Sequence, residues 1–346
     1  MQSDEPRRVR VRDLGLAVGT GEVGPTNTIV DVAGVRVGHT TVSDGGSTFS
    51  GATAVVVDGV SPLTPTTAGV FVGNGFGKLV GSTQIAELGL LETPIVLTST
   101  LSVFRAADAI VTWVLREVDD SVVSINPVAA EVNDSWLSSP GRRPVTSDHV
   151  LQAIDAASTD AVQLGSVGGG TGACALGFKG GIGSSSRRVV AAGREATVGV
   201  LVQTNMDGRL RAFGRVIDPA DHGVDVAGPP EADGSCVVLV AVDLPLDPNT
   251  LRRVAARAVY ALARTGARFS HGSGDYAIAL SSRPGVSWVH LSDSEISATF
   301  DATMDAVEEA VIDALLAART VRSQNGNQAW ALPVHALTGA AQDARS

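Results

Sequence analysis

Cysteine, aromatic residues and long apolar runs are all scarce in this sequence. Two of the 346 residues are cysteines, Cys174 and Cys236, and they match neither a zinc-ligand pattern nor a disulfide framework. Both lie in apolar surroundings, so we expect two small, buried, free thiols. No apolar run approaches the roughly 20 residues of a bilayer-spanning helix, and no apolar segment follows the charged N-terminus as it does in a secretory signal. We therefore expect a soluble protein of the cytoplasm.

Positive charge is also in the minority. The 26 Lys and Arg residues face 36 Asp and Glu residues, which gives a formal net charge of -10, and no long basic run interrupts the sequence. A partner rich in phosphate is bound by basic patches. The composition therefore predicts no nucleic-acid partner, and the lack of apolar runs predicts no membrane partner.

Motifs for metals and nucleotides are missing. The histidines include no HExxH or other close pair of metal ligands, so no metal site is predicted. Residues 170–175 fit GxGxxA, but the GFKGGIG that follows is too rich in glycine to form the helix on which a dinucleotide pyrophosphate rests. Gly77-Lys78 resembles the end of a P-loop, but Val72 and Leu79 stand where the motif needs glycine and a hydroxyl residue. The sequence thus predicts no cofactor.

A serine–histidine triad has little local support. The GxSxG elbow is absent, because His271 occupies the place of the first glycine before Ser273. A triad that joins Ser273 to His39 or His290 stays an alternative, although nothing in the neighbouring sequence favours it.

The remaining composition is that of a packed globular protein. Apolar residues make up 44% and charged residues 18% of the chain, and the mean hydropathy is +0.20. Short segments rich in Val, Ile and Thr, bounded by Gly, Pro or Asp, predict strands at Thr28–Val32, Ala52–Val57, Ala196–Gln203, Cys236–Val242 and Tyr276–Leu280. Helical periodicity predicts helices at Ser102–Val118, Ser147–Ala157, Thr250–Arg264 and Ser294–Arg319. Strands and helices mix throughout, which favours a layered α/β architecture.

The last of these helices has a two-sided pattern. We expect its apolar side chains to face inward, namely Ile296, Phe300, Met304, Val307, Val311 and Leu315. We expect Glu308, Glu309 and Asp313 to face outward. Elsewhere, glycine clusters at residues 73–77, 165–172, 180–183 and 272–274 are typical of tight turns whose exposed N–H groups hold an anion.

Residues 215–234 stand apart from both periodicities. They are rich in proline and acidic residues, so we expect a long surface loop without helix or strand. Loops of this length within a compact domain are usually mobile or functional.

A serine stands where this loop meets a predicted buried strand. Attack of the Ser235 hydroxyl on the carbonyl of Gly234 is an acyl shift, and glycine tolerates the strained backbone that the attack needs. Hydrolysis of the ester frees the α-amine of Ser235, whose unperturbed pKa of about 7.7–8.0 suits a general base near neutral pH. Nucleophile and base then belong to one residue. A serine at a loop-to-strand junction is also common as a plain turn residue.

Several sequence blocks occur in order along nearly the whole chain: RDLG at 12–15, IVDVAGVRVGHT at 29–40, GGGTG at 168–172, FKGGIG at 178–183, NGN at 325–327 and ALP at 331–333. These blocks resemble the DmpA-type aminopeptidases, which include L-aminopeptidase/D-Ala-esterase/amidases and β-peptidyl aminopeptidases. The resemblance implies the four-layer αββα sandwich of N-terminal-nucleophile hydrolases, in one domain over residues 1–346. It also implies cleavage between Gly234 and Ser235 into an α-chain of residues 1–234 and a β-chain of residues 235–346, and a homotetramer of αβ units.

The resemblance implies a role for each of six residues. Ser235 is similar to the family nucleophile, Ser273 to the second serine that hydrogen-bonds it, and Asp275 to the acid two residues further on, which is Glu in the β-peptidyl members. Asn205 is similar to the asparagine whose side chain binds the oxyanion, with the backbone N–H of Asn133 as its partner. Glu131 resembles the carboxylate that holds the free ammonium of the substrate. Taken singly, Asn205, Glu131 and Ser273-Gly274-Asp275 are also compatible with ordinary turn and loop positions.

The implied reaction is metal-free and cofactor-free hydrolysis of the amide or ester bond after an N-terminal amino acid, with a small peptide, aminoacyl amide or aminoacyl ester as substrate. Two alternatives stay open at this point. One is an acyltransferase of the related ornithine-acetyltransferase fold, although its nucleophile is threonine. The other is a binding protein with the same fold that is never cut.

Overall fold

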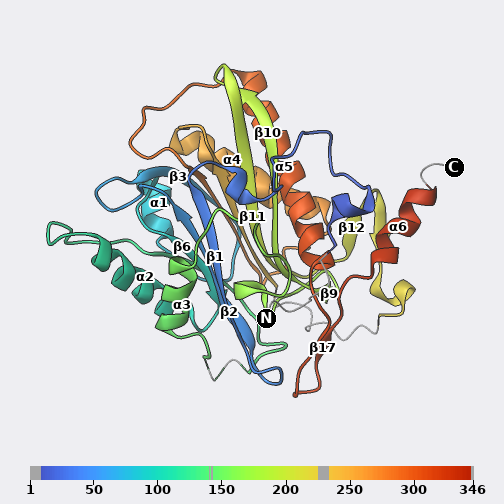
Figure 1. The fold of residues 1–346 in the computed structure, drawn as a ribbon. Helices are drawn as coiled ribbons and strands as arrows, with labels where there is room; N and C mark the ends of the chain where they lie inside the picture. Colours follow the sequence, from blue (N-terminus) through green and yellow to red (C-terminus); the bar gives the residue numbers. More distant parts are fainter. Residues whose placement is uncertain (1–8, 140, 142, 225–233, 344–346) are drawn as a thin grey trace.

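Two β-sheets lie face to face between two layers of helices in the computed structural model, which describes residues 9–139, 141, 143–224 and 234–343 (Figure 1). The first sheet has the strand order β1-β2-β6-β7-β4, with β1 (Val35–Ser43), β2 (Phe49–Val57), β6 (Ile95–Ser99), β7 (Val128–Val132) and β4 (Leu79–Val80). The second has the order β10-β11-β14-β15-β3-β5, with β10 (Gly181–Ala191), β11 (Arg194–Asn205), β14 (Ser235–Val242), β15 (Gly274–Ser281), β3 (Thr66–Gly75) and β5 (Leu90–Leu91).

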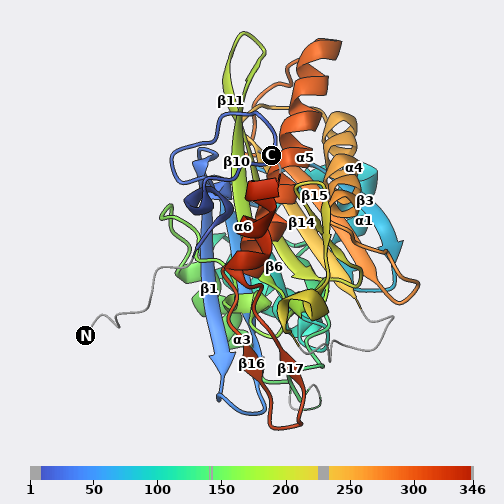
Figure 2. The same ribbon diagram turned by 90° about the vertical axis from the view of Figure 1, so that its right-hand side faces the viewer.

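The helices cover the outer face of each sheet. Their bounds are α1 (Ser82–Leu88), α2 (Val103–Glu117), α3 (Ser147–Asp155), α4 (Pro248–Arg264), α5 (Asp293–Leu316) and α6 (Val334–Asp343). Helices α2 and α3 pack on the first sheet, and α4 and α5 lie side by side on the second (Figure 2). No helix among the residues that the structure places is both long and apolar enough to cross a bilayer.

Shorter elements complete the chain. Three two-stranded pairs are β8 (Cys174–Ala175) with β9 (Phe178–Lys179), β12 (Leu210–Ala212) with β13 (Arg215–Ile217), and β16 (Val321–Arg322) with β17 (Gln328–Ala329). Single 3₁₀ turns are η1 (Val11–Leu14), η2 (Ile29–Asp31), η4 (Gly168–Gly170) and η5 (Pro219–His222).

A central apolar core holds the two sheets together. Val55 and Leu97 of the first sheet pack in one cluster with Leu201, Val237 and Ile278 of the second. Because these side chains alternate along their strands with residues that face the helices, each sheet buries both of its faces. The predicted αββα sandwich is confirmed.

Most of the predicted elements are present. The strands predicted at 52–57, 196–203, 236–242 and 276–280 lie within β2, β11, β14 and β15, and the four predicted helices correspond to α2, α3, α4 and α5. Helix α4 begins as the sequence indicates: the Asp247 side chain accepts hydrogen bonds from the N–H groups of Asn249 and Thr250, and Pro248 occupies the first turn.

Two predicted elements are wrong. The strand expected at Thr28–Val32 is the 3₁₀ turn η2, because the Asp31 carboxylate binds the N–H of Thr28 and satisfies the backbone locally. The loop expected over 215–234 contains strand β13 and turn η5, while its residues 225–233 lie outside the described residues.

The predicted outward face of α5 is also partly wrong. Glu309 and Asp313 are fully buried. Arg187 of β10 pairs with Glu309 at 2.7 Å, and Arg12 of the N-terminal segment reaches the same carboxylate at 2.8 Å. Arg10 pairs with Asp313 at 2.7 Å. The N-terminal segment therefore covers a face of α5 that its own periodicity indicates as exposed to solvent.

Candidate active site

Three strand ends place the predicted nucleophile. Strands β14 and β15 are parallel and joined by α4, so both begin at the same edge of the sheet, with Ser235 opposite Gly274. Strand β11 is antiparallel to β14 and ends at this edge, with Asn205 opposite Ser235. The topology therefore brings Ser235, Asn205 and the residues around Gly274 together, although they are far apart in the sequence.

The backbone N–H of Gly274 lies between the two reacting groups of the predicted cleavage. Its nitrogen is 3.3 Å from the Ser235 hydroxyl oxygen and 3.3 Å from the carbonyl oxygen of Gly234. Ser235 is 4% exposed, so this hydroxyl is shielded from bulk water. A donor at this position favours negative charge on the Gly234 oxygen.

Close backbone packing requires glycine both before Ser235, at position 234, and opposite it on β15, at position 274. A Cβ atom on Gly274 would lie 3.0 Å from the Cα atom of Gly77 and 3.1 Å from the ring of Tyr276. A Cβ atom on Gly234 would lie 2.8 Å from the backbone nitrogen of Asp207. Side chains at these positions would displace the backbone that carries the cleavage bond and its hydrogen-bond donor.

Ser273 and Asp275 flank Gly274 and are both buried. They do not form the hairpin turn that the local sequence also allowed, because Asp275 is the second residue of β15. Burial raises the pKa of Asp275 to about 6, against a smaller opposing effect of a hydrogen bond from the Ser273 side chain. Asp275 Oδ2 has no hydrogen-bond partner among the residues that the structure places. The site thus holds a carboxyl group that changes charge near pH 6.

Asn74 of β3 fixes the loop before β15, and no motif in the sequence identifies it as a site residue. Its side-chain amide donates hydrogen bonds to the carbonyl oxygens of Ser273 at 2.5 Å, Ser270 at 2.9 Å and His271 at 3.0 Å. Asn74 also lies opposite Asp275 in the register of β3 and β15. The one sequence signal for Asn74 is its position between two glycines, in a cluster that is typical of tight turns with anion-binding N–H groups but forms the end of β3 here.

Asn205 presents a defined end of its amide group to the site. Its side-chain oxygen accepts a hydrogen bond from the backbone N–H of Cys174 at 2.8 Å. Because the oxygen is held on that side, the NH₂ group points the other way. Asn205 is 4% exposed and pairs directly with Ser235, so it is a buried donor beside the predicted nucleophile.

Glu131 lies on strand β7 and is 2% exposed, so it is not a solvated loop acid. Its Oε1 atom accepts a hydrogen bond from the backbone N–H of Lys78 at 3.1 Å and lies 3.4 Å from Lys78 Nζ. Its Oε2 atom has no hydrogen-bond partner in the described part of the chain. The charge of Glu131 also acts on its neighbour Tyr276. Burial first, and then the charges of Glu131 and Asp275, raise the pKa of the Tyr276 hydroxyl. A buried carboxylate with a vacant acceptor atom is a suitable receptor for an ammonium group.

The structure also places Asn133, the two histidines of the alternative triad and the two cysteines. Asn133 follows β7 directly, and its side-chain oxygen accepts a hydrogen bond from the N–H of Ser135 at 3.0 Å. The role of its backbone N–H stays a prediction. Of the histidines considered for a triad, His39 lies 2.9 Å from the hydroxyl of Thr53, and His290 is exposed. Cys174 and Cys236 are buried, free thiols, as predicted.

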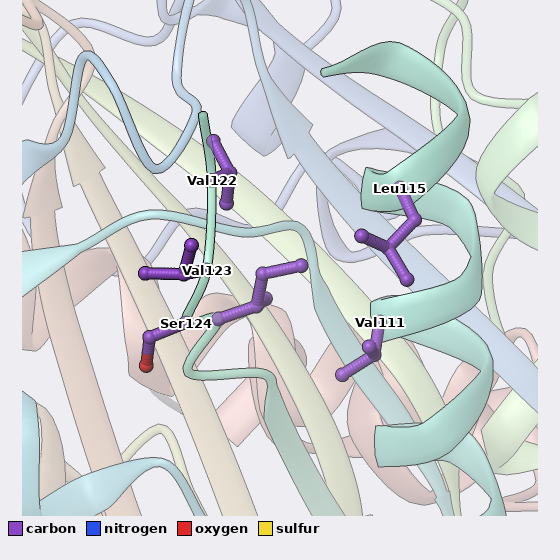
Figure 3. Close-up of a pocket in the computed structure, with 6 residues that line it drawn as sticks. Val111, Leu115, Val122, Val123 and Ser124 are labelled. Carbon is purple, nitrogen blue, oxygen red and sulfur yellow. The ribbon is translucent and has the colours of Figure 1, made fainter. Parts of the chain in front are cut away.

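An open surface pocket lies between α2 and the segment after it (Figure 3). Its lining is mostly aliphatic and consists of Val111, Leu115, Val122, Val123, Ser124 and Ile125. None of the predicted site residues belongs to this lining, so the pocket is separate from the edge where Ser235 lies.

Comparison with known proteins gives consistent results. Residues 27–329 match the family model described as peptidase family S58. A β-peptidyl aminopeptidase, BapA, from Sphingosinicella microcystinivorans is 35% identical over 94% of this chain and 89% of the relative. The solved structure of a β-aminopeptidase from Burkholderia sp. has a TM-score of 0.88 and 37% identity, over 97% of this chain and 99% of that one.

A second solved structure gives the fold its description. The L-aminopeptidase D-Ala-esterase/amidase from Ochrobactrum anthropi has a TM-score of 0.87 and 34% identity, over 97% of this chain and 99% of that one. That structure is described as a prototype for the serine aminopeptidases and as a variant of the N-terminal-nucleophile hydrolase fold.

Proposed function

Because the chain belongs to peptidase family S58 and is an aminopeptidase with the N-terminal-nucleophile hydrolase fold, we propose that Ser235 is its nucleophile and that cleavage after Gly234 activates it. The observation that carries this proposal is the Gly274 N–H, which lies 3.3 Å from both the Ser235 hydroxyl oxygen and the Gly234 carbonyl oxygen. One donor thus contacts both partners of the proposed cleavage.

Cleavage proceeds by an acyl shift. Ser235 Oγ attacks the Gly234 carbonyl carbon, and the Gly274 N–H stabilises the negative charge that develops on the carbonyl oxygen. The C–N bond then breaks, the nitrogen of residue 235 takes the hydroxyl proton, and Gly234 is left as an ester on Ser235. Water hydrolyses this ester, which releases the carboxylate of Gly234 and leaves Ser235 with both a free hydroxyl and a free α-amine.

Peptide hydrolysis then uses the new α-amine. The neutral amine of Ser235 removes the proton from its own hydroxyl, because its unperturbed pKa of about 7.7–8.0 lies close to neutral pH. The hydroxyl oxygen attacks the substrate carbonyl, and the side chain of Asn205 with the backbone N–H of Asn133 binds the oxyanion. The leaving amine takes the proton, and water hydrolyses the acyl-enzyme.

Substrate selection rests on the carboxylate of Glu131. Its vacant Oε2 atom is the acceptor for the substrate's ammonium group, which explains a requirement for a free N-terminus. Ser273 hydrogen-bonds the nucleophile, and the charge of Asp275 favours the ammonium form of the Ser235 amine during turnover. We propose small peptides, aminoacyl amides and aminoacyl esters as substrates, and a tetramer of αβ units as the assembly.

The relatives narrow the substrate proposal. The names of the compared proteins include a β-peptidyl aminopeptidase and an L-aminopeptidase D-Ala-esterase/amidase. A panel of β-alanyl, L-alanyl and D-alanyl p-nitroanilides therefore covers the relevant amino-acid classes, and the value of kcat/KM for each ranks them.

Mass spectrometry of the active protein tests the cleavage directly. We expect two fragments, residues 1–234 and 235–346, from the wild type. Ser235→Ala should leave one intact chain without activity, whereas the control Ser297→Ala, at an exposed serine on α5, should be cut and active. Full activity in an intact wild-type chain would refute the proposal, as would full activity of Ser235→Ala.

A further inference from the structure

Lys179 is one of the two lysines in the sequence and is completely buried. Its ammonium group donates hydrogen bonds to three backbone carbonyl oxygens, those of Ala173 at 2.7 Å, Gly180 at 2.9 Å and Gly170 at 3.1 Å. The reaction steps proposed for Ser235, Asn205 and Glu131 do not involve this cation. Burial of an ammonium group is costly, so its position calls for a functional explanation.

The peptide group between Ala173 and Cys174 links Lys179 to the site. Its carbonyl oxygen accepts the hydrogen bond from Lys179, and its N–H donates to the side-chain oxygen of Asn205 at 2.8 Å. The register of the small β8–β9 pair places Cys174 opposite Lys179, so the arrangement is built into the fold. Asn205 in turn lies opposite Ser235. An unbroken series of three polar groups therefore runs from a buried cation to the predicted oxyanion donor.

We propose that Lys179 is a positioning residue that strengthens Asn205 as the oxyanion donor through the Ala173–Cys174 peptide group. The positive charge draws electron density toward the carbonyl oxygen, which makes the Cys174 N–H a stronger donor. That bond polarises the Asn205 amide in the same sense, so its NH₂ group binds an oxyanion more strongly. This inference rests on the oxyanion role of Asn205 in the proposed function.

The groups around Lys179 determine the pH range in which its ammonium group is charged. Burial lowers the pKa of Lys179 to about 8, although the nearby Asp134 and Cys174 act in the opposite direction. Burial raises the pKa of Asp134 to about 7 and that of Cys174 to about 11. Asp134 and Lys179 thus titrate within about one pH unit of each other, so the Asp134→Asn variant is needed to separate their effects.

A double-mutant cycle tests the coupling. The variants Lys179→Met, Asn205→Ala and their combination are compared with wild type as fully cleaved enzymes, using kcat and KM for one aminoacyl p-nitroanilide. Asn205→Ala should lower kcat by about 10²- to 10³-fold. Lys179→Met should lower kcat by about three- to tenfold with KM unchanged, and by less than about twofold when Asn205 is already Ala. Arg188→Met, which removes an exposed cation on β10, is the control and should leave kcat unchanged.

The outcomes distinguish this inference from the proposed function. If Asn205→Ala keeps the kcat of the wild type, the oxyanion role itself is wrong. If Asn205→Ala is impaired but Lys179→Met lowers kcat equally in both backgrounds, Lys179 acts only on the structure and the inference is overturned. The same conclusion follows if Lys179→Met raises KM and leaves kcat unchanged.

Nuclear magnetic resonance gives a second test that needs no folded Lys179 variant. Cys174 follows Ala173 whereas Cys236 follows Ser235, so carbonyl-¹³C alanine with ¹⁵N cysteine yields a single correlation from the Ala173–Cys174 peptide. Labelled lysine side chains give two signals, for Lys78 and Lys179. As the pH is raised, the signal of the Ala173–Cys174 peptide should shift over the same pH range as the Lys179 signal. This should hold in both wild type and Asp134→Asn. A peptide signal that does not move as Lys179 titrates would overturn the inference.

Discussion

Lys78 and Glu131 form an ion pair of 3.4 Å in which the carboxylate is buried and the ammonium is 42% exposed. The pair engages only Oε1 of the carboxylate, since Oε2 has no hydrogen-bond partner among the described residues. Lys78 and Glu131 therefore contribute differently to binding of the substrate's ammonium group. A solvated ammonium contributes little to such a pair, whereas a buried carboxylate without its charge cannot hold an ammonium ligand.

Glu131→Gln should accordingly weaken substrate binding. We expect KM for aminoacyl p-nitroanilides to rise by about 10- to 100-fold, because a hydrogen bond to a charged group typically contributes about 1.5–3 kcal/mol. Lys78→Met is the matched control at the same carboxylate and should change KM by less than about fivefold. Steady-state kinetics of both variants measure this difference. An unchanged KM in Glu131→Gln would show that the substrate's ammonium group binds elsewhere.

Gly274→Ala should slow cleavage of the precursor. The added Cβ atom would lie 3.0 Å from the Cα atom of Gly77, so the backbone must move and carry its N–H away from the Gly234 carbonyl oxygen. Loss of one oxyanion donor typically costs about 10²- to 10³-fold in rate. Gly75→Ala is the control on the opposing strand, where the nearest atom would be 3.8 Å away. Time courses on denaturing gels measure both rates, and equal rates would contradict the role given to Gly274.

Glu309→Ala should strongly destabilise the fold. Arg187 and Glu309 are both fully buried and 2.7 Å apart, so the substitution leaves an unpaired buried cation, which typically costs about 3–5 kcal/mol. Glu308→Ala is the adjacent control, because Glu308 is partly exposed and lies 3.7 Å from Arg264; we expect a loss below about 1 kcal/mol. Denaturant titrations of the two variants measure the difference. A similar small loss in both would mean that the buried pair is not needed for stability.

The pH dependence of the stability that this ion-pair network provides follows from the pKa of Glu309. Burial alone would raise the pKa of Glu309, but hydrogen bonds from Arg12 and Asn27 and the charges of Arg187 and Arg12 lower it overall. Its contribution to stability is therefore complete above the unfolded pKa of about 4.3 and is lost as the pH falls through the lower, folded value. Acid should thus destabilise wild type relative to Glu309→Gln.

The elements that the sequence predicts well are those determined by neighbouring residues. The apolar stripe of α4 and its Asp247-Pro248 start lie within one continuous segment, and the apolar strands β11 and β14 need no distant information either. Glu309 is different, because its partners Arg12 and Arg187 are 297 and 122 residues away. A periodic pattern cannot indicate that a charged helix face is covered by a distant segment of the same chain.

The candidate site divides in the same way. Ser235 is marked locally by a glycine, a hydroxyl group and a buried strand, so its position at the sheet edge follows from the sequence once the strand is recognised. No local sequence pattern of this kind surrounds Asn74 or Lys179. Asn74 acts through the register of β3 with β15, and Lys179 through the pairing of β8 with β9 and the end of β11. Only the folded chain brings these residues to the backbone groups that they hold.

Asp275→Asn should change the pH profile of the mature enzyme. Burial raises the pKa of Asp275 to about 6, so the carboxyl group loses its charge as the pH falls through that value. The Ser235 amine must also be neutral, with a pKa of about 7.7–8.0. The logarithm of kcat/KM for wild type should therefore rise with pH at a slope of two below about pH 6 and at a slope of one from there to the amine pKa of about 7.7–8.0.

In Asp275→Asn the slope should be one at every pH below the amine pKa, and the plateau above that pKa should be lower than in wild type. Substrate ammonium groups stay protonated between pH 4.5 and about 7, so binding does not distort the comparison there. Because burial disfavours the charged form, Asp275 should reduce wild-type stability as the pH rises from the unfolded pKa of about 3.9 to the folded pKa of about 6. Asp275→Asn should thus gain stability relative to wild type above pH 6 while it loses activity. A variant that keeps the slope of two would assign the lower ionisation to another group.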